Sequence, residues 1–428
     1  MKRALVLAGG GTRGIYQIGA LKALHELEQD QFDMIFGVSV GALNAALLVQ
    51  GDLDRLIYMY EHLESSQIVK GFVPNDMSIG NLINERQEFI PAFKYYMANH
   101  SFDFTPFYDL CDQYFDYDKF MASPIEFYCV TATAKNHDGI LVDKKMIEKD
   151  GQNWIIASAS AYPAFPMMNI NGEDYVDGGY FDNFPIDFAL QKGAEEIVGI
   201  DLGSQPLHPL YLEKDHIRYV HPREELFNFL TFDKEKMQHA RVLGYNDTMK
   251  TYGRFEGFKY TFYPFSLPSY FDEYYRGLLM LETKIYLATS LNERFRSQQV
   301  ITNLLKEQMH VDHLNTRQYL YGILDALLDL CNVSSEKVYT LEEAKKIILA
   351  TFAKCAYEGY AIKPNGITDI VSYCKTLDRK GIVEKMVHAN LYPKDRFINE
   401  DAMMTLYPFE VALADFVTIM MKHLVEER

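Results

Sequence analysis

The first two hundred residues alternate between short apolar runs and longer segments whose apolar residues recur at helical spacing. Apolar runs that suit buried strands occupy residues 3–8, 33–38, 126–133 and 196–201. Segments with helical spacing occupy residues 13–28, 40–50, 52–62 and 184–192. Strands that alternate with helices build a mostly parallel sheet with helices on both faces. The pattern predicts an α/β fold whose site lies at the carboxyl ends of the strands.

From about residue 270 onward the pattern changes to helix. Thr340-Leu341-Glu342-Glu343 is a capping-box sequence, and it precedes an apolar face at helical spacing. Further helices are predicted at residues 272–298, 299–309, 315–331, 366–378, 380–389 and 407–426. The 428 residues also exceed what one hydrophobic core usually supports. We therefore expect an α/β domain over residues 1–265 and an all-helical C-terminal domain over residues 266–428.

The charge balance narrows the classes of partner. Residues 1–265 hold 23 Lys/Arg and 37 Asp/Glu, a net charge of −14, whereas residues 266–428 carry a net charge of −3. Nucleic-acid binding requires a basic face, so this composition argues against a nucleic-acid partner. An anionic bilayer would repel the acidic domain, so peripheral membrane contact would have to depend on apolar side chains.

Targeting signals and cysteine usage favour the cytoplasm. Lys2-Arg3 begins like a signal peptide, but the apolar run Ala4 to Ala8 is too short for one. No stretch approaches the 18 apolar residues that span a bilayer. The five cysteines are odd in number and show no close pairing, as is usual for reduced thiols. We therefore expect a cytoplasmic protein.

The segment Gly37-Val38-Ser39-Val40-Gly41 carries the first candidate chemistry. It lies between an apolar run that ends at Phe36 and an Ala/Leu-rich helical segment, so Ser39 would stand on a tight strand-to-helix turn. A G-x-S-x-G sequence in this context is the nucleophile elbow of serine hydrolases. Gly37 and Gly41 leave room for the turn, and the serine projects at a helix N-terminus that favours negative charge. A plain strand-to-helix turn is the simpler alternative.

A glycine loop and an Asp-Gly-Gly sequence add two more candidate features. Gly9-Gly10-Gly11-Thr12-Arg13-Gly14 follows the first apolar run and would expose several backbone N–H groups to a phosphate or an oxyanion. Asp177-Gly178-Gly179 places a carboxylate beside two glycines, which permits close approach to another backbone.

A dinucleotide site is the competing interpretation of the glycine loop. Gly9, Gly11 and Gly14 also satisfy G-x-G-x-x-G, which requires an acidic residue at the end of a second strand. Asp33 precedes its strand instead of ending it, and no Gly-Lys-Ser/Thr follows the glycines as in a P-loop. These features leave a nucleotide-binding or scaffold protein as the weaker alternative.

Together, these motifs resemble the patatin-like phospholipase family over roughly residues 1–260. The oxyanion motif G-G-G-x-R-G is intact at Gly9 to Gly14, G-x-S-x-G at Ser39 and D-G-G at Asp177. The N-x-P that commonly follows stands as Asn183-Phe184-Pro185, and the small-residue segment before D-G-G resembles Ala157 to Pro166. The resemblance implies a three-layer α/β/α sandwich and a serine acyl hydrolase that acts on lipid esters without a cofactor or metal.

The resemblance also assigns roles to the residues. Ser39 would attack the ester carbonyl, and Asp177 would act as general base without an intervening histidine. The loop of Gly9, Gly10, Gly11, Thr12, Arg13 and Gly14 would form the oxyanion hole, with the N–H groups around Gly10 and Gly11 as donors. Gly37 and Gly41 would shape the elbow, and Gly178 and Gly179 the Asp-Gly-Gly loop. Arg13 could support the loop, contact a substrate phosphate or form a structural salt bridge.

Other catalytic arrangements find less support in the sequence. A Ser–Asp–His triad would need one of the downstream histidines His208, His216, His221 or His239, none of which lies in a recognisable motif. His216/His221 and His310/His313 lack a metal-ligand framework. An acyltransferase or thioesterase would use the same dyad with another acceptor or ester.

An aromatic-rich segment supplies the candidate lipid contact. Between residues 67 and 119, large apolar side chains recur between prolines: Ile68, Phe72, Val73, Met77, Ile79, Phe89, Ile90, Phe93, Tyr95, Tyr96 and Met97. This segment would form an acyl-chain pocket or lid beside Ser39, or it would simply pack into the core. The expected partner is a lipid or acyl-ester substrate; the sequence leaves the oligomeric state open.

Overall fold

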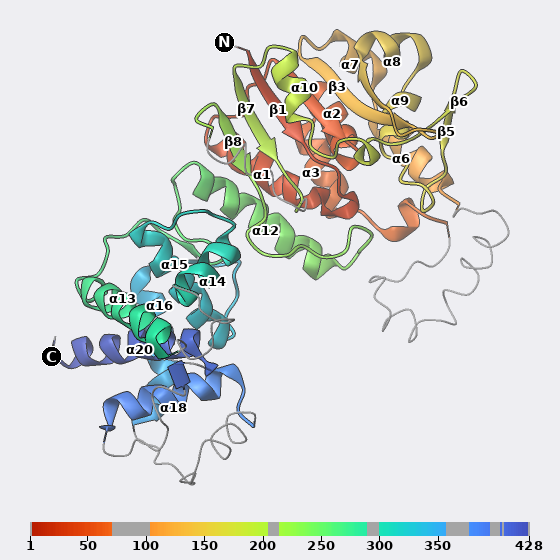
Figure 1. Cartoon of the computed structure of the whole chain (residues 1–428). Coiled ribbons are helices and arrows are strands. Elements are labelled where there is room, and N and C mark those ends of the chain that lie inside the picture. The colour runs from red at the N-terminus through yellow and green to blue at the C-terminus, as the bar shows by residue number, and fades with distance from the viewer. Residues whose placement is uncertain are drawn as a thin grey trace. The chain divides into compact units, whose positions relative to one another are not determined.

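The chain divides into two compact units, Met1–Gly253 and Arg254–Arg428, in a computed structural model (Figure 1). The structure describes residues 2–70, 103–203, 214–288, 299–356, 376–393, 403–404 and 406–426. The division follows Gly253, whereas the change of sequence pattern suggested a boundary after residue 265. Each unit has its own hydrophobic core.

The first unit is built around a mostly parallel sheet. Its described strands are β1 (Arg3–Leu7), β2 (Met34–Val38), β3 (Glu126–Thr133), β4 (Gly139–Asp143), β5 (Met168–Ile170), β6 (Glu173–Asp177), β7 (Glu196–Ile200) and β8 (Ile217–Val220). They follow the order β5-β6-β3-β2-β1-β7-β8, with β4 paired to β3. The neighbouring strands β3, β2, β1, β7 and β8 are all parallel to one another. Strands β4 and β6 are antiparallel to β3, and β5 is antiparallel to β6.

Helices flank this sheet. They are α1 (Gly14–Glu26), α2 (Val40–Val49), α3 (Leu53–Glu61), α6 (Thr105–Tyr114), α7 (Tyr117–Ala122), α8 (Lys144–Asp150), α9 (Asn153–Ser158), α10 (Ile186–Gln191) and α12 (Lys234–Thr251). Helices α2 and α9 pack against β3, α10 contacts β1 and β7, and α12 packs against α1. Strands β1 and β2 are almost continuously apolar because helices bury both faces of the sheet. The expected α/β architecture with a mostly parallel sheet is therefore present.

The register of β3 brings two distant segments to one place. Val38, the last residue of β2, pairs with Val130. Asp177, the last residue of β6, pairs with Thr131, the next residue along β3. Strand β2 and strand β6 therefore end at adjacent positions of the same partner strand. This register sets Ser39, which follows Val38, beside Asp177.

The described residues of the second unit are helical apart from one short pair of strands. Its helices are α13 (Tyr270–Ala288), α14 (Val300–Met309), α15 (Thr316–Leu330), α16 (Leu341–Phe352), α18 (Arg379–Leu391) and α20 (Pro408–Glu426). Two-residue strands β9 (Thr261–Phe262) and β10 (Val338–Tyr339) pair in parallel. The predicted capping box is formed, because Thr340 accepts from the Glu343 amide and Glu343 accepts from the Thr340 amide. The predicted helix at 366–378 falls mostly outside the described residues, as does the end of the one at 272–298.

In the described part of the chain, no helix is long and apolar enough to cross a bilayer.

Candidate active site

Ser39 stands on a strained turn between β2 and α2. Its backbone has φ 55° and ψ −128°, a conformation that residues with a side chain rarely adopt. A Cβ atom on Gly37 would lie 2.3 Å from the Gly41 carbonyl oxygen, and one on Gly41 would lie 2.4 Å from the Leu7 carbonyl oxygen. Both glycines are therefore required for the chain to turn this sharply against β1. The serine side chain is left at the N-terminus of α2.

A hydrogen bond to the Ser158 side chain holds the backbone of the elbow in place. The Ser39 amide donates to Ser158 Oγ at 3.0 Å, and Ser158 Oγ donates to the Val130 carbonyl at 2.6 Å. Ser158 is fully buried at the end of α9. The Ser39 amide is thereby occupied, so it is not a free donor for a substrate oxygen. In the sequence, Ser158 stands out only as a member of the small-residue segment.

Asp177 lies beside Ser39 at the end of β6. Its carboxylate accepts a hydrogen bond from the Gly179 amide at 2.7 Å and lies close enough to Ser39 for the serine hydroxyl to favour the charged form. The side chain is nearly buried, with 6% of its surface exposed. Burial raises the pKa of Asp177 to about 6, and the Ser39 hydroxyl and the Gly179 amide oppose that rise. Gly178 permits this position, because a Cβ there would lie 2.0 Å from the Val130 carbonyl oxygen.

The glycine loop follows β1 and opens into the 3₁₀ helix η1 (Gly11–Arg13). Gly11 has φ 58°, and a Cβ there would lie 2.1 Å from the Phe229 carbonyl oxygen. That same carbonyl accepts from the Thr12 amide at 2.8 Å and from Thr12 Oγ1 at 3.0 Å. Among the described residues, no acceptor bonds to the amides of Gly10 and Gly11. These two N–H groups are therefore available to a ligand.

Arg13 anchors the loop to a distant part of the chain. Its Nε donates to the Phe227 carbonyl at 2.6 Å, and its Nη1 approaches the Leu202 carbonyl at 3.5 Å. The side chain also lines the polar cavity in front of Ser39. Of the roles expected for Arg13, support of the loop is the one that the observed hydrogen bonds favour.

Two cavities meet at Ser39. The first, which we call the vestibule, is more open and more polar than the second; it is lined by Gly9, Gly10, Gly11, Arg13, Ser39, Ala161, Asp177, Gly179, Tyr180, Asn183, Leu202, Gly203 and Phe229. The second, which we call the slot, is almost wholly apolar and runs from Ser39 between α2, α3 and α6. Gly11, Ser39, Ala161 and Phe229 line both cavities. A ligand that reaches Ser39 can therefore place a polar end and an apolar end in different chambers.

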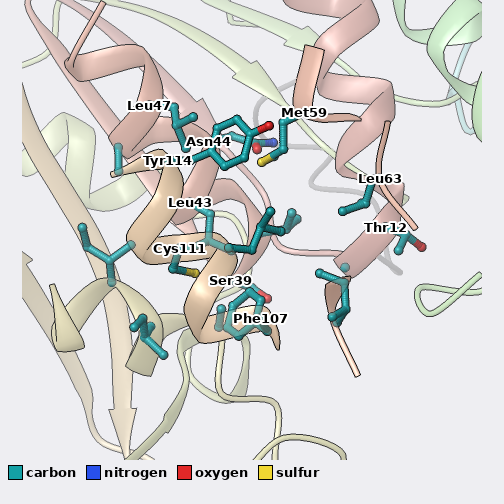
Figure 2. A pocket seen from close by; sticks show the side chains of 18 of the residues that line it. Thr12, Ser39, Leu43, Asn44, Leu47, Met59, Leu63, Phe107, Cys111 and Tyr114 are labelled. Atoms are coloured by element: carbon teal, nitrogen blue, oxygen red, sulfur yellow. The ribbon is translucent and has the colours of Figure 1, made fainter. Parts of the chain in front are cut away.

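Two helices line the slot with matched faces. Helix α2 contributes Val40, Leu43, Asn44 and Leu47, and α6 contributes Phe107, Leu110, Cys111 and Tyr114. Both sets follow the i, i+3, i+4, i+7 spacing of one helix face. Figure 2 shows Ser39 with Phe107 at one end and Leu47 with Tyr114 at the other. Eight residues of α2 rise by about 12 Å from Ser39 to Leu47, which is long enough for the first part of an extended acyl chain.

The aromatic-rich segment predicted near the lipid supplies part of this slot. Ile68 and the residues of α6 lie on its wall. Phe72 to Met97, with Phe93 among them, fall outside the described residues.

Histidines and metal-binding clusters take no part in the described site. No described histidine lines the vestibule or the slot. Burial lowers the pKa of His221 to about 4, so this side chain is neutral at pH 7. His239 pairs with Glu224 away from both cavities, and His208 lies outside the described residues. Within the described ranges, no group of three His, Cys, Asp or Glu side chains is arranged to hold a metal ion.

Comparison with known proteins identifies the first unit. Residues 5–190 match the family model described as patatin-like phospholipase. This part of the chain is a patatin-like phospholipase domain. The matched range contains the glycine loop, Ser39 and Asp177 but ends before the segment around Phe229 that holds the loop.

The curated relatives match slightly less than half of this chain. Lysophospholipase NTE1 of Eremothecium gossypii is 29% identical over 205 residues, which cover 47% of this chain and 12% of that protein. Patatin-like phospholipase domain-containing protein 7 of Mus musculus is 27% identical over 206 residues, which cover 47% of this chain and 14% of that protein. The chain thus spans only a small part of these relatives. The crystal structure of VipD from Legionella pneumophila is 13% identical, with a TM-score of 0.40, over 96% of this chain and 91% of that one.

Three residues that sequence analysis gave no catalytic role help to build the site in the patatin-like domain. Ser158 fixes the elbow, Asn183 bonds to Gly9, and Phe229 bonds to Thr12. The motif segments contain Ser158 and Asn183, so their positions carried a signal. Phe229 lies 217 residues from Thr12, and nothing in the local sequence pointed to that contact.

Proposed function

We propose that the patatin-like domain is a serine acyl hydrolase that cleaves a carboxylic ester of a lipid through Ser39 and Asp177. One observation carries this proposal. A serine on a strained elbow lies beside a buried carboxylate at the point where the vestibule meets the apolar slot. The arrangement supplies a nucleophile, a base and separate places for the two halves of a lipid ester.

The reaction would proceed in two steps. Ser39 Oγ attacks the ester carbonyl while Asp177 takes the hydroxyl proton, and the carbonyl oxygen becomes an oxyanion. The free amides of Gly10 and Gly11 would donate to that oxyanion. Collapse expels the alcohol, which receives the proton from Asp177, and leaves an acyl group on Ser39. Water, deprotonated by Asp177, then releases the fatty acid and regenerates the serine.

The environment of Asp177 supports its role as a base. An ordinary aspartate, with a pKa near 3.9, is a weak acceptor for a serine proton. Burial raises the pKa of Asp177 to about 6, which brings the carboxylate closer to the value that favours proton transfer near neutral pH. The carboxylate nevertheless remains ionised at pH 7, so it is ready to accept the proton.

The shape of the site favours a lipid with one long acyl chain. The apolar slot begins at Ser39, and the facing sides of α2 and α6 supply much of its lining. The relatives named lysophospholipase support the same class, since a lysophospholipid has a single acyl chain and a polar remainder. The polar remainder would occupy the vestibule beside Arg13.

The net charge of −14 over residues 1–265 favours dispersed substrates over anionic bilayers. The four described cysteines are free, which fits a reducing, cytoplasmic location.

Hydrolysis of nitrophenyl acyl esters and of lysophospholipids tests this proposal. The wild-type protein is expected to release free fatty acid, and Ser39→Ala is expected to release none above background. Ser123→Ala, which removes a hydroxyl that lines neither cavity, is the matched control and should retain full activity. Hydrolysis that survives Ser39→Ala would contradict the proposal. Transfer of the acyl group to an added alcohol or thiol in place of water would assign the same dyad to an acyltransferase.

A further inference from the structure

Asn183 lies where the glycine loop and the Asp-Gly-Gly turn approach each other. A Cβ atom on Gly9 would lie 2.4 Å from Asn183 Oδ1 and 2.9 Å from Ser39 Cβ. A Cβ atom on Gly179 would lie 2.9 Å from the same Asn183 Oδ1 and 3.1 Å from Asp177 Oδ1. The asparagine amide therefore fills the space between the two motifs, next to both members of the dyad. Gly9 and Gly179 are required partly because this side chain is there.

Two hydrogen bonds join Asn183 to Gly9. The Gly9 amide donates to the backbone carbonyl of Asn183 at 3.2 Å. In return, the side-chain Nδ2 of Asn183 donates to the backbone carbonyl of Gly9 at 3.1 Å. The opposite orientation of the side-chain amide would set two oxygen atoms 3.1 Å apart without a proton between them. The hydrogen bonding thus fixes which way the amide points.

The planarity of the peptide bond transmits this contact to Gly10. In a trans peptide the C=O and N–H groups point in opposite directions. Once Asn183 Nδ2 holds the Gly9 carbonyl, the direction of the Gly10 N–H is set as well. The preceding peptide is held in the same manner, because Gln17 Nε2 donates to the Ala8 carbonyl at 2.8 Å. The two contacts leave the glycine loop little freedom to rotate its peptide planes, even though glycines are otherwise the most mobile residues.

Asn183 is itself firmly placed. The next residue, Phe184, has only 1% of its surface exposed. Its backbone amide donates a hydrogen bond to Asp182 Oδ1 at 2.9 Å. A Cβ on Gly199 would lie 2.7 Å from the tip of the Phe184 ring, so the ring packs directly on β7. The buried Phe184 therefore anchors the Asn183 backbone to the sheet.

We propose that Asn183 is a positioning residue of the oxyanion hole, which holds the Gly9–Gly10 peptide so that the Gly10 N–H faces the developing oxyanion. This inference rests on the proposed function. Asn183 stabilises the transition state through Gly10 and does not itself touch the reacting atoms. Loss of its Nδ2 group releases the Gly9 carbonyl and lets the Gly10 N–H turn away.

The test compares an ester with its thionoester, in which sulfur replaces the carbonyl oxygen. Amide donors stabilise a developing oxyanion far better than a developing thiolate, so a working oxyanion hole favours the oxygen substrate. For Asn183→Ala we expect kcat on the oxoester to fall by about 10²-fold, the scale reported for small misplacements of catalytic groups, with little change in KM. The ratio of kcat/KM between the oxoester and the thionoester should fall by about tenfold.

Asn169→Ala is the matched control. Asn169 lies on β5, in the hairpin that leads to Asp177, and its Nδ2 donates to Asp174 at 2.7 Å, away from the glycine loop. This variant should keep both kcat and the oxygen-to-sulfur ratio of the wild-type protein. If Asn183→Ala folds poorly, Asn183→Leu keeps a similar shape without the donor and should show the same two losses.

The outcomes separate this inference from the proposed function. Wild-type hydrolysis that depends on Ser39, together with an unchanged ratio in both Asn183 variants, would uphold the function and overturn the inference. A reduced kcat with an unchanged ratio would also overturn it, because a general structural defect slows both substrates alike. A reduced kcat with a reduced ratio is the result that supports it.

Discussion

The vestibule and the slot meet at Ser39, but backbone turns form most of the vestibule, whereas helix side chains form most of the slot. Turns at the ends of β1, β2 and β6 line the vestibule, and most of its hydrogen bonds involve backbone groups of glycine-rich segments. Side chains of α2, α3 and α6 line the slot, and nearly all are apolar. Backbone geometry would therefore set the reaction, whereas exchangeable side chains would set the choice of acyl chain. Variants in the two chambers should therefore affect different kinetic constants.

The largest expected effect comes from the base in the vestibule. Asp177→Asn keeps the shape of the side chain but removes the proton acceptor, so kcat should fall by about 10²- to 10⁴-fold on short and long esters alike. Asp174→Asn, on the exposed part of the same strand, is the matched control and should remain active. Steady-state kinetics on two chain lengths measures both effects. A loss confined to long-chain esters would show that Asp177 shapes the slot instead of serving the reaction.

The same substitution should stabilise the fold at neutral pH. Burial raises the pKa of Asp177 from 3.8 to about 6, so between these values the folded protein holds a proton that the unfolded chain has lost. Stability therefore falls as the pH rises through 6, and Asp177→Asn removes this cost. The free energy of unfolding of the variant should exceed that of the wild type by about 3 kcal/mol at pH 8 and by little at pH 4. Urea denaturation at the two pH values measures the difference; an equal or lower stability of the variant at pH 8 would contradict it.

In the slot, a larger side chain one turn from Ser39 should act on chain length alone. Leu43→Phe narrows the slot at a position that lines it. The larger ring occupies space that a long acyl chain would fill, so kcat/KM for long-chain esters should fall by about tenfold or more while acetyl esters are little affected. Leu48→Phe on the same helix, at a partly buried position outside the slot, is the control. Equal losses on short and long esters would remove the slot from the account of specificity.

The pH dependence should report the vestibule and not the slot. Because Asp177 must be ionised to act as base, kcat/KM should rise with pH, level off above about 6, and be about tenfold lower at pH 5. Leu43→Phe should lower the curve for long-chain esters without moving its midpoint. A midpoint that shifts with chain length, or a rate that is flat from pH 5 to pH 8, would break the separation between the two chambers.

Sequence analysis captured the vestibule better than the slot for a physical reason. Glycines in the sequence mark the ends of strands. The elbow follows the end of β2, the glycine loop follows the end of β1, and Asp177 is the last residue of β6. The four predicted strands match β1, β2, β3 and β7 within one residue at each end. Helices α1, α2, α3 and α10 likewise fall inside their predicted ranges. The catalytic roles of Ser39, Asp177 and the glycine loop stay predictions until they are measured.

The strands that were not predicted are the antiparallel and edge strands. Strand β6 follows a tight Asn171-Gly172 turn, at which both residues have positive φ, so the hairpin signal was present but short. The contacts of Phe229 with the glycine loop could not be predicted, because they join residues more than two hundred positions apart. The faces of α2 and α6 are apolar in any fold, and only their packing shows that they enclose a slot.

Direct trapping of the acyl-enzyme tests the central claim most sharply. The wild-type protein is mixed with a slowly hydrolysed acyl ester, quenched in acid during turnover, digested and analysed by peptide mass spectrometry. We predict that the acyl mass appears on the peptide that contains Ser39 and is absent in Ser39→Ala. An acyl group on another residue, or steady turnover by Ser39→Ala, would contradict the assignment of Ser39 as the nucleophile.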